Sequence, residues 1–186
     1  MGCFICGTER VKFHGNSMSA QEGKQERRDY CEPCFVATFG SQPEATQLVE
    51  HARKLREKDI QSKVLRDLER LRTKFRPKLE ELIAKNPRFP FEAYEFIFAS
   101  LTRAVHEMEP DPQSRGRNAT AAELVRACGE QARRAWGDDA KAHAQALGFR
   151  TASDIGDIVF LLIENGYMGK RDSDNRADFD GLPFFS

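Results

Sequence analysis

Residues 60–82 decide the fold, because in IQSKVLRDLERLRTKFRPKLEEL the apolar side chains recur at intervals of 4, 4, 3, 4, 4 and 3. These intervals place the apolar side chains on one face of a helix and leave the other faces to charged residues. Pro77 has no amide hydrogen, so it is expected to kink this helix or to start a new one. The apolar positions are Ile60, Val64, Leu68, Leu71, Phe75, Leu79 and Leu82.

Helix signals continue on both sides of this run. Upstream, Ser41-Gln-Pro-Glu44 has the spacing of a capping box, in which the serine caps a backbone amide and the glutamate reaches back. Downstream, Pro87 and Pro90 predict a break before a helix over residues 91–108. The expected fold class is therefore mainly α.

Capping boxes also organise the C-terminal third of the chain. Thr120-Ala-Ala-Glu123 predicts a helix that ends at Trp136-Gly137, and Thr151-Ala-Ser-Asp154 predicts another that ends at Asn165-Gly166. A shorter helix is expected at about residues 138–147 between them. The tail is acidic, and its apolar residues 182–185 are expected to dock on these helices.

The N-terminal forty residues carry two C-x2-C pairs. Zinc prefers four soft ligands in a tetrahedron, and two such pairs complete that shell, so one structural zinc ion is expected. Residues 11–14 and 29–30 are predicted strands, with a turn at 15–16 and a mobile loop over 17–28. Residues 35–39 are expected to form a helical turn whose amides stabilise the second pair. The four ligands are Cys3, Cys6, Cys31 and Cys34.

Knuckle, hairpin and helix in this order resemble a treble-clef zinc finger, and a zinc ribbon is the neighbouring alternative. Iron in the same thiolate shell is the other alternative, because the ligands alone do not distinguish it from zinc. A closed shell of four thiolates leaves no position for a reacting water, so the metal is expected to be structural. The sequence shows no paired carboxylates in a plausible pocket, no Ser-His-Asp spacing and no phosphate loop, so the protein is not expected to be an enzyme. A small module of this size has little core, so the metal should supply most of its folding free energy.

Formal net charge is zero, but charge is unevenly distributed. Residues 41–90 carry 13 basic and 8 acidic side chains, and residues 91–186 carry 11 basic and 16 acidic ones. The basic stretch is the candidate nucleic-acid contact, although its interleaved acids favour a solvated face or a helix partner. The candidate phosphate-binding residues are Lys54, Arg56, Lys63, Arg66, Arg70, Arg72 and Lys74.

Other single residues are assigned ordinary roles. Cys128 stands alone on a predicted helix and is expected to be a buried small side chain. The acidic residues of the tail do not match the calcium-binding loop of an EF-hand. Arg176 and Ala177 occupy the positions at which that loop needs an oxygen ligand and a glycine. The helix from Asp154 to Glu164 carries no basic residue, which argues against its being a DNA-recognition helix.

The C-terminal half also carries a specific set of motifs. They are Phe91-Glu-Ala-Tyr-Glu-Phe96, Trp136-Gly137, Gly148-Phe149, Thr151 with Asp154-Ile-Gly-Asp-Ile-Val-Phe160, Gly166-Tyr-Met-Gly-Lys170, Asp174 and Asp178-Phe179. Together they resemble an uncharacterised bacterial family of hypothetical proteins, of the planctomycete and verrucomicrobial type, over roughly residues 88–186. The family has no assigned activity, so the resemblance implies a bacterial cytoplasmic setting and little more. The cysteine spacing alone looks like that of kinase-activator and chaperone-adaptor proteins.

These patterns predict three parts: a four-cysteine zinc module at 1–40, a basic helical connector at 41–87, and a helical domain with an acidic tail at 88–186. No apolar run approaches about 18 residues, and the start lacks the pattern of a signal peptide, so a cytoplasmic protein without membrane contact is expected. The expected function is a non-enzymatic adaptor or regulator with a protein partner. The alternative is a regulator that binds nucleic acid, associated with transcription or the ribosome. No small-molecule substrate is evident.

Overall fold

The computed structural model describes residues 13–18, 25–108 and 118–185. Within these residues the chain is mainly helical, and its strands form one two-stranded hairpin, which confirms the predicted fold class. The described residues form two compact units, with the division between Asp59 and Ile60. We call them the N-terminal unit (residues 13–59) and the helical unit (residues 60–185). No helix among the described residues has the length and apolar character needed to cross a membrane.

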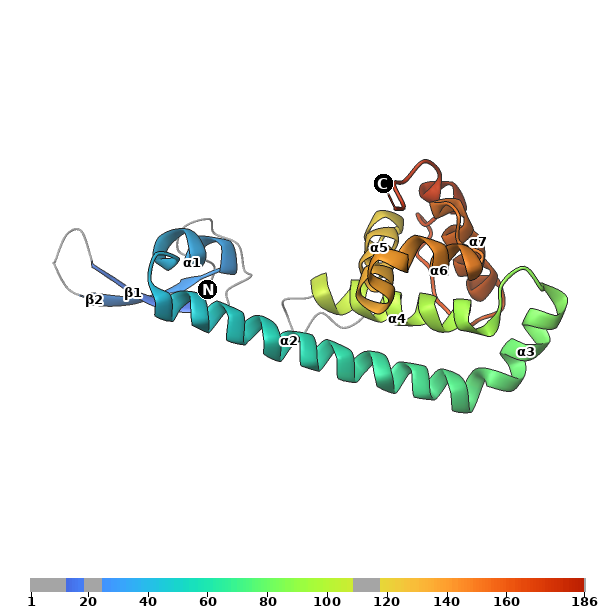
Figure 1. The fold of residues 1–186 in the computed structure, drawn as a ribbon, viewed down its shortest axis with the longest axis horizontal. Coiled ribbons are helices and arrows are strands. Elements are labelled where there is room, and N and C mark those ends of the chain that lie inside the picture. The colour runs from blue at the N-terminus through green and yellow to red at the C-terminus, as the bar shows by residue number, and fades with distance from the viewer. Residues whose placement is uncertain (1–12, 19–24, 109–117, 186) are drawn as a thin grey trace. The chain divides into compact units, whose positions relative to one another are not determined.

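The N-terminal unit is a β-hairpin followed by two helices. Strand β1 (Phe13–Met18) is antiparallel to β2 (Gln25–Tyr30), and then come α1 (Glu32–Phe39) and the first part of α2 (Pro43–Arg70). Its core is small and aromatic, because the ring of Phe35 stacks on the ring of Phe13 with centroids 4.8 Å apart. The buried members of this core are Phe13, Tyr30, Phe35, Ala45 and Val49. Figure 1 shows the hairpin and α1.

Two expectations for the hairpin are wrong. Gly15 and Asn16 form no turn, because they lie inside β1 opposite Arg28 and Arg27. The predicted loop over residues 17–28 is also too long, since both of its ends belong to the strands. A Cβ atom at Gly15 would lie 2.6 Å from the ring of Phe39, so glycine is needed here for close packing of strand on helix.

The helical unit begins with the end of α2, and most of its elements follow the sequence signals. Pro77 stands in the first turn of α3, as expected, and the break around Pro87 and Pro90 precedes α4. Capping boxes at Thr120 and Thr151 start α5 and α7, as predicted. The elements are η1 (Leu71–Phe75), α3 (Arg76–Lys85), α4 (Phe91–Met108), α5 (Ala121–Trp136), η2 (Gly137–Asp139), α6 (Ala140–Ala146), α7 (Ala152–Glu164) and η3 (Arg176–Phe179).

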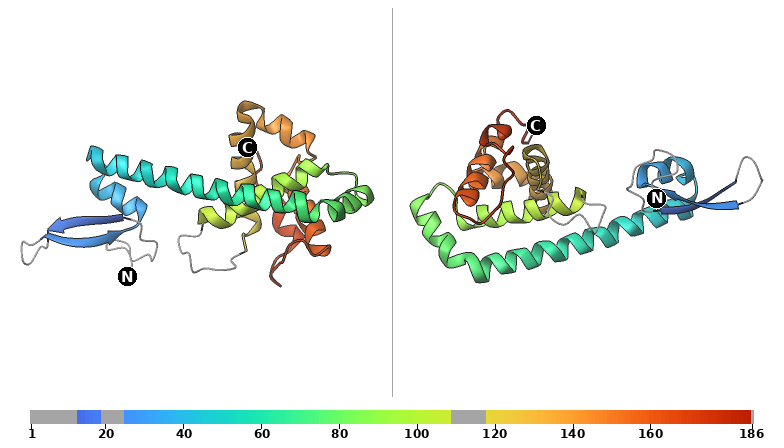
Figure 2. Two further views of the ribbon diagram at one scale, coloured as in Figure 1. Left: turned by 90° about the horizontal axis from the view of Figure 1, so that it is seen from below. Right: turned by 180° about the vertical axis from the view of Figure 1, so that it is seen from behind.

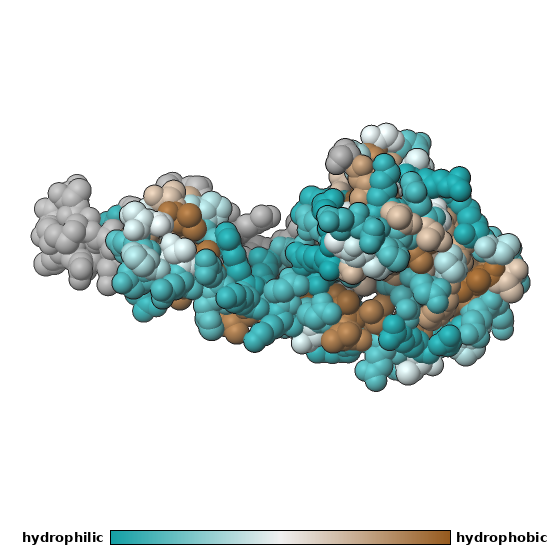
Figure 3. Space-filling view, viewed as in Figure 1, coloured by the Kyte–Doolittle hydropathy of each residue, from teal (hydrophilic) through white to brown (hydrophobic). Residues whose placement is uncertain are grey.

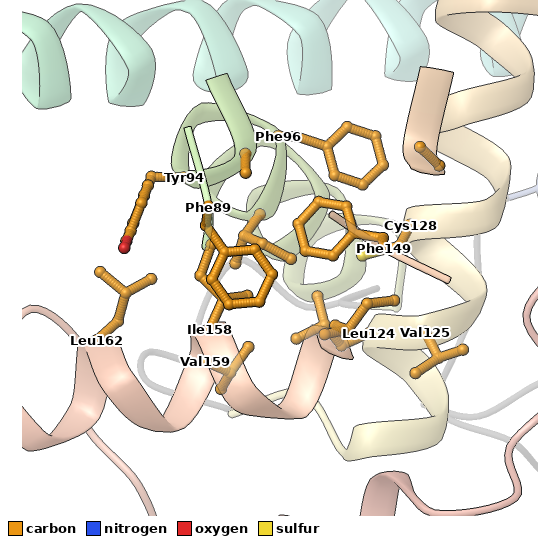
Figure 4. Packing of buried hydrophobic residues seen from close by; sticks show 14 of the residues in the cluster. Phe89, Tyr94, Phe96, Leu124, Val125, Cys128, Phe149, Ile158, Val159 and Leu162 are labelled. Atoms are coloured by element: carbon orange, nitrogen blue, oxygen red, sulfur yellow. The ribbon is translucent and has the colours of Figure 1, made fainter. Parts of the chain in front are cut away.

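The core of the helical unit lies between α4 and the helices that follow it. Figure 1 shows α5, α6 and α7 on one side of α4, and the reverse view in Figure 2 agrees. Figure 4 shows the rings of Phe89, Phe96 and Phe149 gathered at its centre, with the centroid of Phe149 5.7 Å from each of the other two. The tail docks as predicted, because Leu182, Phe184 and Phe185 pack against this core.

The end of α2 packs on the opposite side of α4. Ile60 and Val64 form a small apolar cluster with Ala99. Polar bonds reinforce it, since the Thr102 hydroxyl donates to Asp67 Oδ2 at 2.8 Å. Arg103 is buried, with 4% of its surface exposed, and it donates to Gln61 of α2 and Gln131 of α5 at 2.7 Å each. Arg103 therefore joins three helices of the unit.

Asp154 fixes the start of α7. Its Oδ2 accepts the amides of Arg150 and Thr151 at 2.8 Å each, and Arg88 forms an ion pair with its other oxygen. Burial by itself raises the pKa of Asp154, but the amide and hydroxyl bonds from Thr151, the Arg150 amide and the charge of Arg88 outweigh it. The pKa of Asp154 therefore lies below its ordinary value of 3.8.

This lowered pKa predicts a dependence of stability on pH. The stabilisation by Asp154 is complete above the unfolded-state pKa of 3.8, and it is lost as the pH falls through the lower folded-state value. The Asp154→Asn substitution is expected to lower the free energy of unfolding by about 1 to 2 kcal/mol at pH 7. Urea unfolding of both proteins at pH 7 and pH 3 measures the effect. A gap between the two that stays as large at pH 3 would contradict this account.

Candidate functional site

The second cysteine pair begins α1. Cys31 is the residue that precedes the helix, with an extended backbone, and its carbonyl accepts the amide of Phe35 at 2.9 Å. Cys34 lies in the first turn, so the helix predicted after this pair is confirmed. Helix N-terminal amides carry a partial positive charge that favours a thiolate. Both thiols thus lie at a helix start, the setting in which a zinc knuckle would use them.

The segment around this pair is held in place by its neighbours. Cys31 is 6% exposed, and Cys34 packs against the aromatic core of the N-terminal unit. Glu32, between them, forms an ion pair with Arg53 of α2 at 2.6 Å. On the hairpin, His14 Nδ1 lies 2.6 Å from the carboxylate of Asp29. The pair therefore lies at the start of a short helix that packs on a hairpin, and the treble clef itself stays a prediction.

The first cysteine pair, Cys3 and Cys6, lies outside the described residues. Among the residues that are described, no three or more His, Cys, Asp or Glu side chains are grouped to hold a metal. Cys31 and Cys34 provide two thiols of the soft kind that zinc prefers, two residues apart. These two thiols fit one half of a four-cysteine site, and the complete set of four ligands stays a prediction.

The seven basic candidates are divided between the two units. On the part of α2 within the helical unit, Lys63, Arg66 and Arg70 share one face, because they are three and four residues apart. Arg72 is ion-paired with Glu95, whose bond and charge raise the pKa of the guanidinium. Lys74 is exposed on η1, while Lys54 and Arg56 belong to the N-terminal unit. Three of the seven candidates thus lie on one face of one helix within one unit.

The remaining sequence candidates have structural roles. Burial raises the pKa of the Cys128 thiol to about 12, although a bond with Ser100 opposes it, so this thiol is no nucleophile at neutral pH. The acids of the tail cap turns, since Asp174 accepts the amide of Arg171 at 2.8 Å and Asp178 that of Asn175 at 2.9 Å.

A cavity in the helical unit was not predicted from the sequence. Its volume is about 420 Å³, and it lies among the end of α2, η1, α4, the start of α5, α7 and the segment that leads to η3. Apolar wall residues include Phe75, Leu101, Phe160, Ile163 and Tyr167. The polar ones are Asp67, Arg70, Thr102, His106, Asn118, Thr120, Asp174, Asn175 and Asp178.

The π-helical segment η1 borders this cavity, and it was not predicted from the sequence either. π-helical turns are uncommon and occur often at functional sites. The sequence gives one weak indication of a π turn here. Leu71, Phe75 and Leu79 follow one another at steps of four, and a π-helix, which has more residues per turn than an α-helix, allows this spacing. An interval of four is equally ordinary in an α-helix, so this pattern could not reveal the π turn.

Comparison with known proteins identifies no relative: no protein family, no curated protein and no solved structure matches the chain. The resemblance of residues 88–186 to an uncharacterised bacterial family therefore stays a prediction.

Proposed function

We propose that the chain is a non-enzymatic, zinc-binding adaptor or regulator that acts by binding another protein. The observation that carries this proposal is the placement of Cys31 and Cys34 at the start of a short helix, directly after a β-hairpin. Cys3 and Cys6 would supply the other two ligands of one structural zinc ion. Such an ion holds a small surface in shape without taking part in a reaction. The thiolate ligands favour a reducing compartment, so a cytoplasmic location belongs to the same proposal.

The N-terminal unit also carries exposed apolar side chains suited to a protein partner. Val36, Leu48 and Leu55 are 43%, 48% and 53% exposed. Leu48 and Leu55 are two turns apart on α2 and share a face. A shallow cavity of about 150 Å³ between α1 and α2 includes Val36 in its wall. Figure 3 shows several separate hydrophobic patches on a mostly hydrophilic face. We define Val36, Leu48 and Leu55 as the apolar contact residues.

A second candidate function is nucleic-acid binding through Lys63, Arg66 and Arg70. Their common face on α2 favours contact with a phosphate backbone. Asp67 and Glu69 interrupt it, however, and weaken its positive potential. The protein partner is therefore the first choice.

Affinity capture with matched variants tests the proposal. Leu55 and Leu65 are both exposed leucines of α2, at 53% and 58%, but only Leu55 belongs to the N-terminal unit. Leu55→Glu is expected to lose a captured protein that wild type and Leu65→Glu retain. The Cys31→Ser, Cys34→Ser variant should lose it as well.

Two results would favour other conclusions. Capture that survives both the Leu55 and the cysteine substitutions would exclude the N-terminal unit as the contact surface. Binding that falls steeply with salt and disappears after nuclease treatment would favour the nucleic-acid alternative.

A further inference from the structure

The cavity of the helical unit has the size and walls of a small-molecule site. Ligand pockets have volumes of about 300 to 1,000 Å³ and are mostly apolar, with a few polar groups that orient the ligand. This cavity of about 420 Å³ falls in that range. Phe75 and Tyr167 form one wall, with ring centroids 5.7 Å apart and edge to face, and both rings are only partly buried. They therefore present aromatic surface to a ligand.

The charged groups of the wall decide which ligand the cavity would take. Three of them are acids, and each has a partner within the unit. Asp67 accepts the Thr102 hydroxyl, Asp174 accepts from Arg171, and Asp178 caps the turn at Asn175. Of these donors Arg171 is the cation, whereas the Thr102 hydroxyl and the Asn175 amide are neutral, so a cationic ligand is the rival occupant that the decylammonium probe below tests.

Arg70 is the charged wall residue of the opposite sign. Its guanidinium lies over the ring of Phe75, with 5.6 Å between the guanidinium carbon and the ring centroid. Among the residues that the structure describes, no carboxylate forms an ion pair with it. Its fork of N–H donors matches a carboxylate in two parallel hydrogen bonds.

The π turn explains how Arg70 reaches this position. Residues five apart on an α-helix point about 140° away from each other, because a turn has 3.6 residues. In a π-helix, residues five apart are joined by a hydrogen bond and come to the same side. The segment η1 (Leu71–Phe75) follows Arg70 directly, and it brings the guanidinium over the ring of Phe75 at the wall of the cavity.

We propose that this cavity binds an amphipathic monocarboxylate with an aliphatic or aromatic body. Its carboxylate would pair with Arg70, and its apolar body would lie along Phe75, Tyr167 and Ile163. The site is separate from the proposed zinc module, so it adds to the proposed function and does not rest on it.

Three probes of equal chain length test the proposal: decanoate, decanol and decylammonium. Each is titrated calorimetrically into the full chain, the two ions below their micelle concentrations and decanol below its solubility limit. Decanoate is expected to bind about tenfold more tightly than decanol, which is about 1.4 kcal/mol, and decylammonium most weakly. Arg70→Gln should remove the advantage of decanoate over decanol. Arg66→Gln, one turn earlier on α2 and outside the cavity wall, should leave it unchanged.

Several results would overturn the proposal. These are no measurable binding of decanoate, tighter binding of decylammonium than of decanoate, or an equal loss of decanoate affinity in the Arg70 and Arg66 variants. Binding of decanoate that Arg70→Gln leaves unchanged would overturn it too. None of these outcomes depends on zinc, so failure here leaves the proposed function intact.

Discussion

Replacing Cys31 and Cys34 by serine is expected to unfold the hairpin and α1 while the helical unit stays folded. Among the described residues, the aromatic core of the N-terminal unit has five buried members, which is too few to order a segment of this length alone. A structural zinc ion contributes on the order of 10 kcal/mol to such modules. Serine does not replace a thiolate as a ligand, so the hairpin and α1 should lose nearly all of their amide protection.

Hydrogen exchange read residue by residue measures this effect, and Trp136 supplies an internal reference. It is the one tryptophan of the chain, and its ring stacks on Phe96 with centroids 5.4 Å apart in the core of the helical unit. Its fluorescence should be unchanged in the double variant. Cys128→Ser is the matched control, since that sulfur is buried in the helical unit and should leave zinc content unaffected. Full protection of the hairpin in the double variant would show that metal does not hold it.

Replacing Arg103 by methionine is expected to cost the helical unit about 3 to 5 kcal/mol, because it breaks a buried, charged network. Methionine keeps an apolar stem but removes the donors to Gln61 and Gln131 and the charge 3.6 Å from Glu107. The side-chain oxygens of Gln61 and Gln131 then lose a hydrogen-bond donor, and the largely buried carboxylate of Glu107 loses an ion-pair partner. Because Gln61 lies on α2, the packing of that helix against α4 should weaken with it.

Urea unfolding followed by Trp136 fluorescence measures the loss of stability. Arg134→Met is the control, because Arg134 approaches the same Glu107 at 3.3 Å while 43% of its side chain is exposed. That substitution should cost less than about 1 kcal/mol. If the two variants lose equal stability, burial of Arg103 is not what makes its network important.

Local signals predicted most of the helical unit. The break at Pro87 and Pro90 and the apolar spacing beyond it predicted α4 at residues 91–108, the bounds observed. The serine, threonine and acid spacing of a capping box depends only on residues within one turn, so Thr120 and Thr151 identified their helices correctly. Cys128 was predicted to be buried because it is a small side chain that stands alone on a predicted helix. The structure confirms that it is buried.

Features that depend on distant residues were missed. Gly15 belongs to a strand because the ring of Phe39 packs against it, and this contact is 24 residues away along the chain. Arg103 is buried with Gln131 accepting from its Nε and Gln61 from its Nη2, although arginine in a helix pattern usually indicates a solvated face. The cavity beside η1 likewise arises from several elements together, and no single segment encodes it.

Zinc K-edge X-ray absorption of the full chain, purified under reducing conditions, tests the central claim most directly. A four-cysteine site predicts one zinc ion per chain with four sulfur neighbours at about 2.3 Å. A preparation without bound zinc would contradict the claim, and so would a shell in which oxygen or nitrogen atoms replace two of the sulfurs.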